Sequence, residues 1–448
     1  MNKNISEILK KIDKDHYSLL VDIGKISRNE GLKSYLVGGM VRDLLLGFDN
    51  LDMDIVVEDS IKDSPARQLA DALIKKFPNC ELSAKHDRFH TAKVVFNING
   101  KKIPIDLAST REEIYEHSAA LPKVSISDLK RDLYRRDFTI NALAVSLLPE
   151  DFGEVVDLFD GLLDLKEKKI RVLHELSFID DPTRMIRAVR FACKLGFKIE
   201  ENTKRLLKEA LDSKQFDNLI EKIRGDRVKI EIRYLFNLPN IEEAIKAFFD
   251  SGIYRMVSTD LNPELSLRGA LATKQSANVT HNEIASSPPK AGPRNDMKQW
   301  LICLALIIKD LIPEKQENIL KNLQLTGDEI KIIKDGFNAS NKLKEKQSVD
   351  SVIVYRELRS ISIESITIAQ MLTTVETPRC GVSTLIDEYI QKTSKIKLEI
   401  TGQDLISMGV KEGRKIGEIL EKVLEMKIKK PKMKKEDEII SAQIYILS

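Results

Sequence analysis

The fold of the N-terminal part follows from the stretch Leu36-Val-Gly-Gly-Met-Val-Arg-Asp43, which is followed by Leu51-Asp-Met-Asp-Ile-Val-Val57. In the first segment, a strand-like run over Ser34–Val37 ends in Gly38-Gly39 and enters a short helix over 40–46. Glycine has no Cβ, so the free N–H groups at such a helix start can approach a phosphate closely. The stretch therefore predicts a phosphate cradle between a strand and a helix.

Two carboxylates follow this cradle on the next expected strand, over 51–58. Asp52 and Asp54 stand at positions i and i+2, and the alternation of a strand places both on one face. Mg²⁺ prefers a few carboxylate ligands together with substrate phosphate oxygens. Two such ions can activate a 3′-hydroxyl and stabilise a leaving pyrophosphate. We predict Asp52 and Asp54 as catalytic metal ligands; the alternative is a solvated pair of aspartates on an edge strand.

The order of elements predicts the fold class and the domains. Helical spacing runs from Ile5 to about Asn29, a helix is expected over Pro65–Phe77, and strands are expected over 91–97 and 102–107. This mixture indicates an α+β head with one small mixed sheet, followed by an all-α neck, body and tail. The predicted boundaries are a head over 1–163, a neck over 164–258, a Ser-, Asn- and Pro-rich insertion over 259–298, and a helical body and tail over 299–448.

Composition excludes several classes of protein. The 448 residues carry 72 Lys and Arg against 69 Asp and Glu, a net charge of +3, so total charge does not identify a partner. Four widely spaced cysteines without a CxxC pair disfavour a disulfide scaffold or a zinc ribbon and indicate a reduced, cytoplasmic protein. The longest apolar run, Trp300–Ile308, is too short to cross a bilayer, so we expect no membrane partner.

Two arginine-rich motifs come later. In Arg135-Arg-Asp-Phe-Thr-Ile-Asn-Ala-Leu-Ala144, the arginines offer guanidinium forks for a triphosphate or a ribose; the alternative is a buried ion pair between an arginine and Asp137. Asp180-Asp-Pro-Thr-Arg-Met-Ile-Arg-Ala-Val-Arg-Phe-Ala192 reads as a helix, with Asp181 as N-cap and Pro182 at its first position. An aspartate and an arginine can together read the Watson–Crick edge of cytosine and adenine. The alternative is a capping aspartate beside a solvated basic stripe.

These motifs, with Asp226-Arg-Val-Lys-Ile-Glu231 and in this order, resemble the class II tRNA nucleotidyltransferase (CCA-adding) and bacterial poly(A) polymerase family. The resemblance covers residues 34–231, and Thr401–Gly417 resembles a segment in the C-terminal part of many members. It implies Mg²⁺, CTP and ATP as substrates, and the acceptor arm of tRNA, with its 3′ end, as partner. For nucleotide binding it implies Gly38, Gly39, Arg42, Asp43, Arg136, Asp137, Asn141, Asp181, Arg184, Arg187 and Arg190.

Within this set the resemblance assigns base reading to Asp181 and Arg184, and it places Arg187 and Arg190 nearer the phosphates. Asp226, Arg227 and Glu231 are expected to brace the reading helix. Asp106, in a strand-like run, is either a third catalytic carboxylate or a polar residue at a strand end.

The expected activity is addition of CCA, or part of it, to tRNA. A poly(A) polymerase and a catalytically silent RNA-binding protein remain alternatives. The Lys-rich run 427–435 is either a solvated, mobile end or a set of phosphate contacts.

Overall fold

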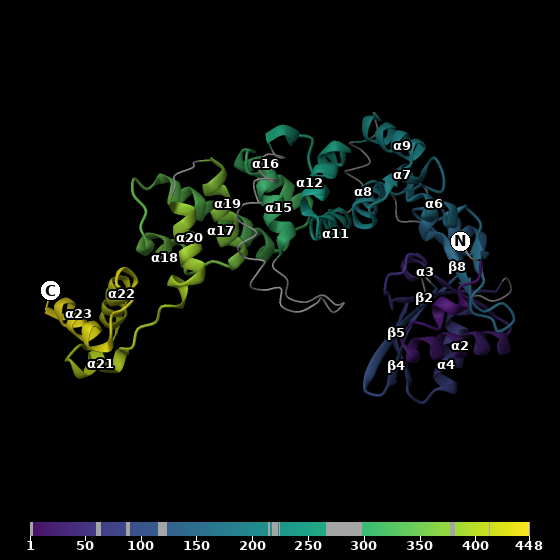
Figure 1. Ribbon diagram of the computed structural model, residues 1–448, viewed down its shortest axis with the longest axis horizontal. Helices are drawn as coiled ribbons and strands as arrows, with labels where there is room; N and C mark the ends of the chain where they lie inside the picture. The colour runs from purple at the N-terminus through teal and green to yellow at the C-terminus, as the bar shows by residue number, and fades with distance from the viewer. Residues whose placement is uncertain are drawn as a thin grey trace. The chain divides into compact units, whose positions relative to one another are not determined.

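The computed structural model describes residues 3–59, 64–86, 90–114, 123–213, 216, 223, 225–265, 298–376, 381–411 and 413–447. The chain forms two compact units, Met1–Val257 and Ser258–Ser448 (Figure 1). The boundary between head and neck at residue 163 falls inside the first unit and stays a prediction. Most of the predicted insertion, residues 266–297, lies outside the described residues.

The first unit contains a seven-stranded mixed sheet in the order β3-β4-β5-β2-β1-β8-β9. Strands β2 and β5 pair in parallel, and the other neighbours pair antiparallel. The strands are β1 (Lys33–Val37), β2 (Met53–Glu58), β3 (Cys80–His86), β4 (Thr91–Ile98), β5 (Lys101–Ser109), β8 (Leu143–Ser146) and β9 (Val155–Asp157). The α+β class is confirmed, although the sequence analysis did not identify β3, β8 and β9.

The register of the central strands brings chemistry-bearing residues together. Asp54 on β2 lies opposite Val37 of β1 on one side and opposite Asp106 of β5 on the other. The β4–β5 hairpin turns at Asn99-Gly100, where both residues have positive φ, as a tight hairpin turn requires. The middle of the sheet therefore presents Asp54, near the start of β2, and Asp106, inside β5, side by side and next to the Gly38 turn.

Helices cover the sheet. Helix α4 (Pro65–Lys76) packs on β2, β4 and β5 and touches α2 (Lys14–Asn29), as Figure 1 shows. The single helical run expected from Ile5 to Asn29 is wrong, because α1 (Ser6–Leu9) ends before α2 begins. The Asp13 carboxylate accepts the Asp15 and His16 N–H groups and so caps a new helix at that point.

The rest of the first unit is mostly helical and carries the second half of the site. Its helices are α3 (Gly39–Leu45), α5 (Leu129–Tyr134), α6 (Gly161–Glu167), α7 (Ser177–Asp180), α8 (Thr183–Leu195), α9 (Glu201–Asp212), α11 (Gly225–Phe236) and α12 (Ile241–Asp250). The same region also contains two short strand pairs, β6–β7 (Arg111–Ile114 and Lys123–Ile126) and β10–β11 (Lys169–Ile170 and Lys198–Ile199). Helix α8 packs against α11 and α12, which fixes the face it presents.

The second unit consists of helices joined by turns and loops, without a strand among its described residues. It contains α15 (Gln299–Ile308), α16 (Pro313–Asn322), α17 (Gly327–Glu345), α18 (Ser351–Leu358), α19 (Ile363–Glu376), α20 (Val382–Gln391), α21 (Gly402–Ser407), α22 (Arg414–Lys429) and α23 (Lys435–Leu447). One apolar core joins α17 to α20, and another joins α21 to α23. In the described part of the chain, no helix combines the length and apolar character needed to cross a bilayer.

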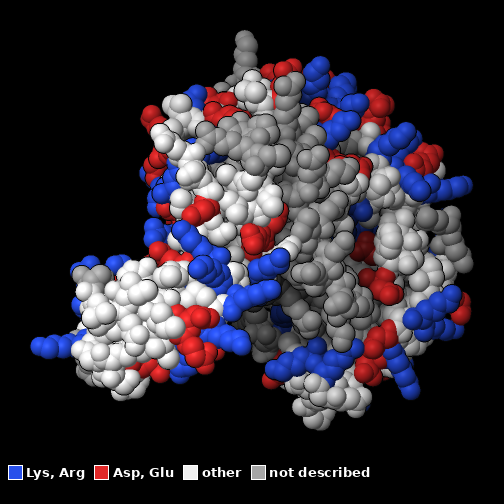
Figure 2. All heavy atoms as spheres, turned by 60° about the vertical axis from the view of Figure 1, so that its left-hand side comes forward, with Lys and Arg blue, Asp and Glu red and all other residues white. Residues whose placement is uncertain are grey.

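The Lys-rich run 427–435 lies between two helices. Its first residues end α22, and its last residue, Lys435, begins α23. Lys427 is buried and forms ion pairs with Glu399 and Glu438. On the face that Figure 2 shows, basic and acidic side chains are interspersed, in keeping with the small net charge.

Candidate active site

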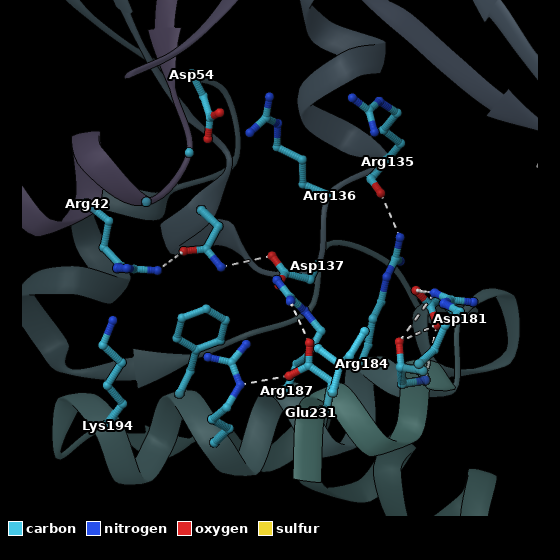
Figure 3. Close-up of a pocket in the computed structure, with 18 of the residues that line it drawn as sticks. Arg42, Asp54, Arg135, Arg136, Asp137, Asp181, Arg184, Arg187, Lys194 and Glu231 are labelled. Atoms are coloured by element: carbon cyan, nitrogen blue, oxygen red, sulfur yellow. Dashed lines mark hydrogen bonds and ion pairs between the residues drawn. The ribbon is translucent and has the colours of Figure 1, made fainter. Parts of the chain in front are cut away.

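A cavity of about 740 Å³ in the first unit collects most of the predicted site residues (Figure 3). Its lining includes Gly38, Gly39, Arg42, Asp54, Arg136, Asp137, Asn141, Asp181, Arg184, Arg187 and Arg190. A neighbouring cavity of about 460 Å³ shares Asp54, Arg135 and Arg136 with it and adds Lys93 and Asp106. Asp54, Arg135 and Arg136 therefore form a wall that the two cavities share.

The glycine turn forms the edge of the cavity nearest to the acids. Gly38 has φ 77° and ψ −145°, a conformation essentially restricted to glycine. A Cβ at this position would lie 3.2 Å from Oδ2 of Asp54. Gly39 then begins α3, whose first N–H groups have no helical partner of their own. The predicted glycine turn at a helix start is thus present, beside a carboxylate; that it binds phosphate stays a prediction.

A chain of hydrogen bonds links this turn to the arginine motif of residues 135–144. Arg42, almost fully buried, donates from Nε to Asp43 and from Nη1 to the Asn141 amide oxygen, both at 2.7 Å. The Asn141 amide donates in turn to Asp137 at 2.9 Å. Figure 3 shows this line of contacts along one side of the cavity. Asp43 lies behind Arg42 rather than in the lining, so its predicted contact with nucleotide would be indirect.

The carboxylates lie close enough to repel one another. Burial, and then the charges of Asp52 and Asp106, raise the pKa of Asp54 to about 6. Asp52 is exposed and precedes β2, which begins at Met53, so the expectation that both aspartates alternate on one strand is wrong. Among the described residues, no three His, Cys, Asp or Glu side chains converge closely enough to hold a metal ion.

The two arginines of the motif share a buried acid that the sequence analysis did not identify. Asp132 is fully buried and accepts from Arg135 at 2.8 Å and from Arg136 at 3.0 Å. Asp137 instead pairs with Arg187 at 2.5 Å. Against the effect of burial, Arg187 holds the pKa of Asp137 below its usual value. The alternative of a buried ion pair at Asp137 is therefore present, with Arg187 as the partner.

The expected base-reading pair lies at the other end of the cavity. Helix α8 begins at Thr183, one residue later than predicted, although Asp181 accepts the Thr183 N–H at 3.1 Å. Asp181 also accepts from Arg227 at 2.7 Å. Arg184 donates to the Ser177 hydroxyl at 2.9 Å and to the Arg135 carbonyl at 2.7 Å. Asp181 and Arg184 share the cavity, but each is held by other groups.

The rest of the α8 arginine stripe is anchored from α11. Glu231 is buried and accepts from Arg187 at 3.0 Å and from Arg190 at 2.7 Å. The guanidinium carbons of Arg42, Arg187 and Arg190 lie 4.9, 5.4 and 4.5 Å from the centre of the Phe191 ring. Three cations around one ring are stabilised by its π face. Glu231 braces the helix, as expected.

Several residues that build the site were not predicted. Phe191 and Lys194 line the larger cavity, and Lys93 lines the smaller one. Phe191 is the second-last residue of the motif at 180–192 and could have been found by asking what the arginines of the motif pack on. Lys93 carried a weaker signal: it stands at an alternating position of an expected strand next to the one that holds Asp106. Lys194 had no signal in the sequence.

Three known protein families match successive parts of the chain. The family described as Poly A polymerase head domain matches residues 34–171, and the tRNA nucleotidyltransferase domain 2 family matches residues 294–444. A third family, a segment of polymerase A, matches residues 196–265. The three matches follow one another along the chain.

Individual relatives and solved structures are also similar to this chain. The chain is 34% identical to an A-adding tRNA nucleotidyltransferase of Geobacter sulfurreducens, over 94% of this chain and 46% of the relative. It is 30% identical to a CCA-adding enzyme of Latilactobacillus sakei, over 89% of this chain and 90% of the relative. The Thermotoga maritima CCA-adding enzyme complexed with tRNA superposes with a TM-score of 0.77 at 28% identity, covering all of both chains.

The alignments cover different shares of these relatives because the relatives differ in length. The chain spans less than half of the Geobacter relative and 21% of an A-adding relative from Aquifex aeolicus. An apo CCA-adding enzyme is 30% identical, with a TM-score of 0.79 and 99% of both chains covered. Membership of such a family implies dependence on a divalent metal ion. The chain belongs to the family of tRNA nucleotidyltransferases and bacterial poly(A) polymerases.

Proposed function

We propose that this protein is a tRNA nucleotidyltransferase that adds C and A to the tRNA 3′ end from CTP and ATP and releases pyrophosphate. One observation carries the proposal: a single cavity holds a glycine turn beside Asp54 at one end and Asp181 with Arg184 at the other. The first end suits a triphosphate, and the second suits the edge of a base. The relatives that act on tRNA 3′ ends support this reading.

The donor set fits a divalent cation. Burial, together with the negative charges of Asp52 and Asp106, raises the pKa of Asp54, and a bound cation would offset the repulsion among these carboxylates. Asp52 and Asp54 would hold Mg²⁺, which accepts one or two protein carboxylates and completes its shell with phosphate oxygens and water. The ion, when bound, would neutralise phosphate charge and activate the attacking hydroxyl. The choice of Mg²⁺ over another divalent ion belongs to this proposal.

The protein's own groups would bind the phosphates and recognise the base. The N–H groups that begin α3 would bind phosphate oxygens, and Arg136, within reach of Gly38 and Asp54, would bind the same end of the nucleotide. The Asp181 carboxylate would accept the exocyclic amine of cytosine or adenine, and Arg184 would donate to a ring acceptor. Uracil and guanine present the opposite pattern at the exocyclic position. This pair would therefore reject UTP and GTP.

A second candidate is addition of the terminal A alone. Three relatives carry the name A-adding tRNA nucleotidyltransferase, and the Geobacter protein among them matches nearly the whole of this chain. The CCA-adding relatives match over similar lengths at 26 to 30% identity. A poly(A) polymerase, the third possibility in the same family, would extend RNA with many A residues.

A primer series separates these activities. Purified protein is incubated with tRNA that ends before CCA, or after the second C, together with labelled CTP, ATP, UTP or GTP. Incorporation of two C and one A supports CCA addition, A on the CC-ended primer alone supports the A-adding candidate, and long A tails support poly(A) synthesis.

The variant Asp54→Asn should lose incorporation with every primer. The matched control Asp71→Asn changes an exposed aspartate of α4 that pairs with Arg67 on the surface, and it should keep activity. Incorporation by neither wild type nor control, with any primer or nucleotide, would refute the proposed function.

A further inference from the structure

A lysine stands in line with the acids of the site. Lys93 on β4 lies directly opposite Asp106 on β5, and Asp106 lies directly opposite Asp54 on β2. Residues that face one another across neighbouring strands project to the same side of a sheet. Lys93, Asp106 and Asp54 therefore form one cross-strand row, and all three line the same cavity.

The row is held by a direct ion pair. Nζ of Lys93 donates to Oδ2 of Asp106 at 2.8 Å, with 39% and 46% of the two side chains exposed. The lysine also acts on its neighbours, because its charge and that of Arg136 oppose the rise in the pKa of Asp54. Lys93 thus places one positive charge near three carboxylates, at the end of the row farthest from Asp54.

The Lys93–Asp106 ion pair gives Asp106 a different role from Asp52 and Asp54. A carboxylate held by an ammonium group at hydrogen-bond distance can bind a second cation only against the repulsion between the two positive charges. Asp52 and Asp54 have no such lysine contact in the described structure, and Asp52 is exposed. Asp106 is thereby distinguished from the other two carboxylates.

We propose that Lys93 is a positioning residue of this carboxylate group, which holds Asp106 beside Asp54 as a charge-balanced acid and leaves Asp52 and Asp54 as the metal ligands. The inference rests on the proposed function, since it assumes that those two aspartates bind a divalent cation. Its consequence is a lower affinity for the free cation than three unpaired carboxylates would give. Removing the lysine would release Asp106 toward the metal.

Binding of Mn²⁺ to the full chain tests this without any turnover. Free Mn²⁺ is followed by electron paramagnetic resonance at pH 7.5, for wild type, Lys93→Met and Lys93→Arg. We expect Lys93→Met to lower the Kd for Mn²⁺ about tenfold, because a unit charge is removed within a few ångströms of the site. Lys93→Arg keeps the charge and should stay within about twofold of wild type.

A control and a double variant complete the design. Lys102→Met removes an exposed lysine from the same hairpin, opposite Asn97 and away from the acids, and should leave the Kd unchanged. Lys93→Met combined with Asp106→Asn should lose the gain, because the released carboxylate is gone. An unchanged Kd in Lys93→Met, or a gain that survives Asp106→Asn, overturns the role of Lys93. If wild type binds no Mn²⁺ with or without ATP, the metal site itself fails, and the proposed function with it.

Discussion

Replacing Glu231 by Gln tests whether one buried acid holds the arginine stripe in place. The Glu231 side chain is 9% exposed, and its two oxygens accept from Arg187 at 3.0 Å and from Arg190 at 2.7 Å. Glutamine keeps the volume but offers one oxygen and no charge. Arg187 would retain Asp137 as partner, whereas both arginines would compete for the single oxygen that remains at position 231.

The magnitude follows from burial. Removing one partner of a buried ion pair costs about 3–5 kcal/mol, because the other charge stays uncompensated. Arg187 keeps a second carboxylate and is about one third exposed, so the lower end applies: about 3 kcal/mol. In a unit of this size, that loss lowers the melting midpoint by roughly 6–12 °C. Scanning calorimetry or thermal circular dichroism of the metal-free chain measures this shift.

A matched pair on the surface provides the control. Arg205 and Glu209 of α9 also form a Glu–Arg pair, at 2.6 Å, but with 52% and 56% of the side chains exposed. Glu209→Gln should cost less than about 0.5 kcal/mol, since exposed pairs contribute little. If Glu231→Gln shifts the midpoint no more than Glu209→Gln does, the anchoring role assigned to Glu231 is refuted.

Three further changes test single features of the site. Without metal, Asp54→Asn should stabilise the protein by about 3 kcal/mol at pH 7–8, because a pKa raised from 3.8 to about 6 makes the ionised carboxylate unfavourable in the folded state. The gain should shrink as the pH falls below about 6 and vanish below about 4, as urea unfolding across pH would show. Gly38→Ala should cost about 1–3 kcal/mol and reduce nucleotide incorporation sharply, since it strains a glycine-only conformation and crowds the Asp54 carboxylate. Gly327→Ala, at the start of α17 where an added Cβ would meet nothing within 4 Å, should keep activity in the same assay. Asp181→Asn should lower the preference for CTP and ATP over UTP and GTP by roughly 10–100-fold in kcat/KM, while Asp180→Asn, outside the cavity lining, should preserve it.

Local signals predicted the elements that local physics determines. The strand and helix around Gly38 and the β4–β5 hairpin with its Asn-Gly turn are where the sequence indicated them. Strand β8 was not identified because all four of its residues are buried, so it shows no alternation inside an apolar run. The break between α1 and α2 carried a readable cap at Asp13, but the apolar spacing continues across it.

Long-range partners could not be predicted in the same way. Asp132 has no special pattern in the sequence, yet it binds both arginines of the neighbouring motif from the buried face of α5. Glu231 lies 44 residues from Arg187, and only the packing of α11 on α8 brings them together. Such contacts depend on helix packing angles, which residue spacing within one element does not determine.

These partners also change the roles expected of the three α8 arginines, Arg184, Arg187 and Arg190. Arg187 and Arg190 were expected near the phosphates, but both are fixed by carboxylates, so a triphosphate would have to compete with Asp137 and Glu231 for them. Arg184 is fixed instead by a hydroxyl and a carbonyl, which are neutral. A guanidinium held by neutral acceptors is not committed to one carboxylate partner. We therefore expect Arg184, rather than Arg187 or Arg190, to be the arginine of α8 that meets a base.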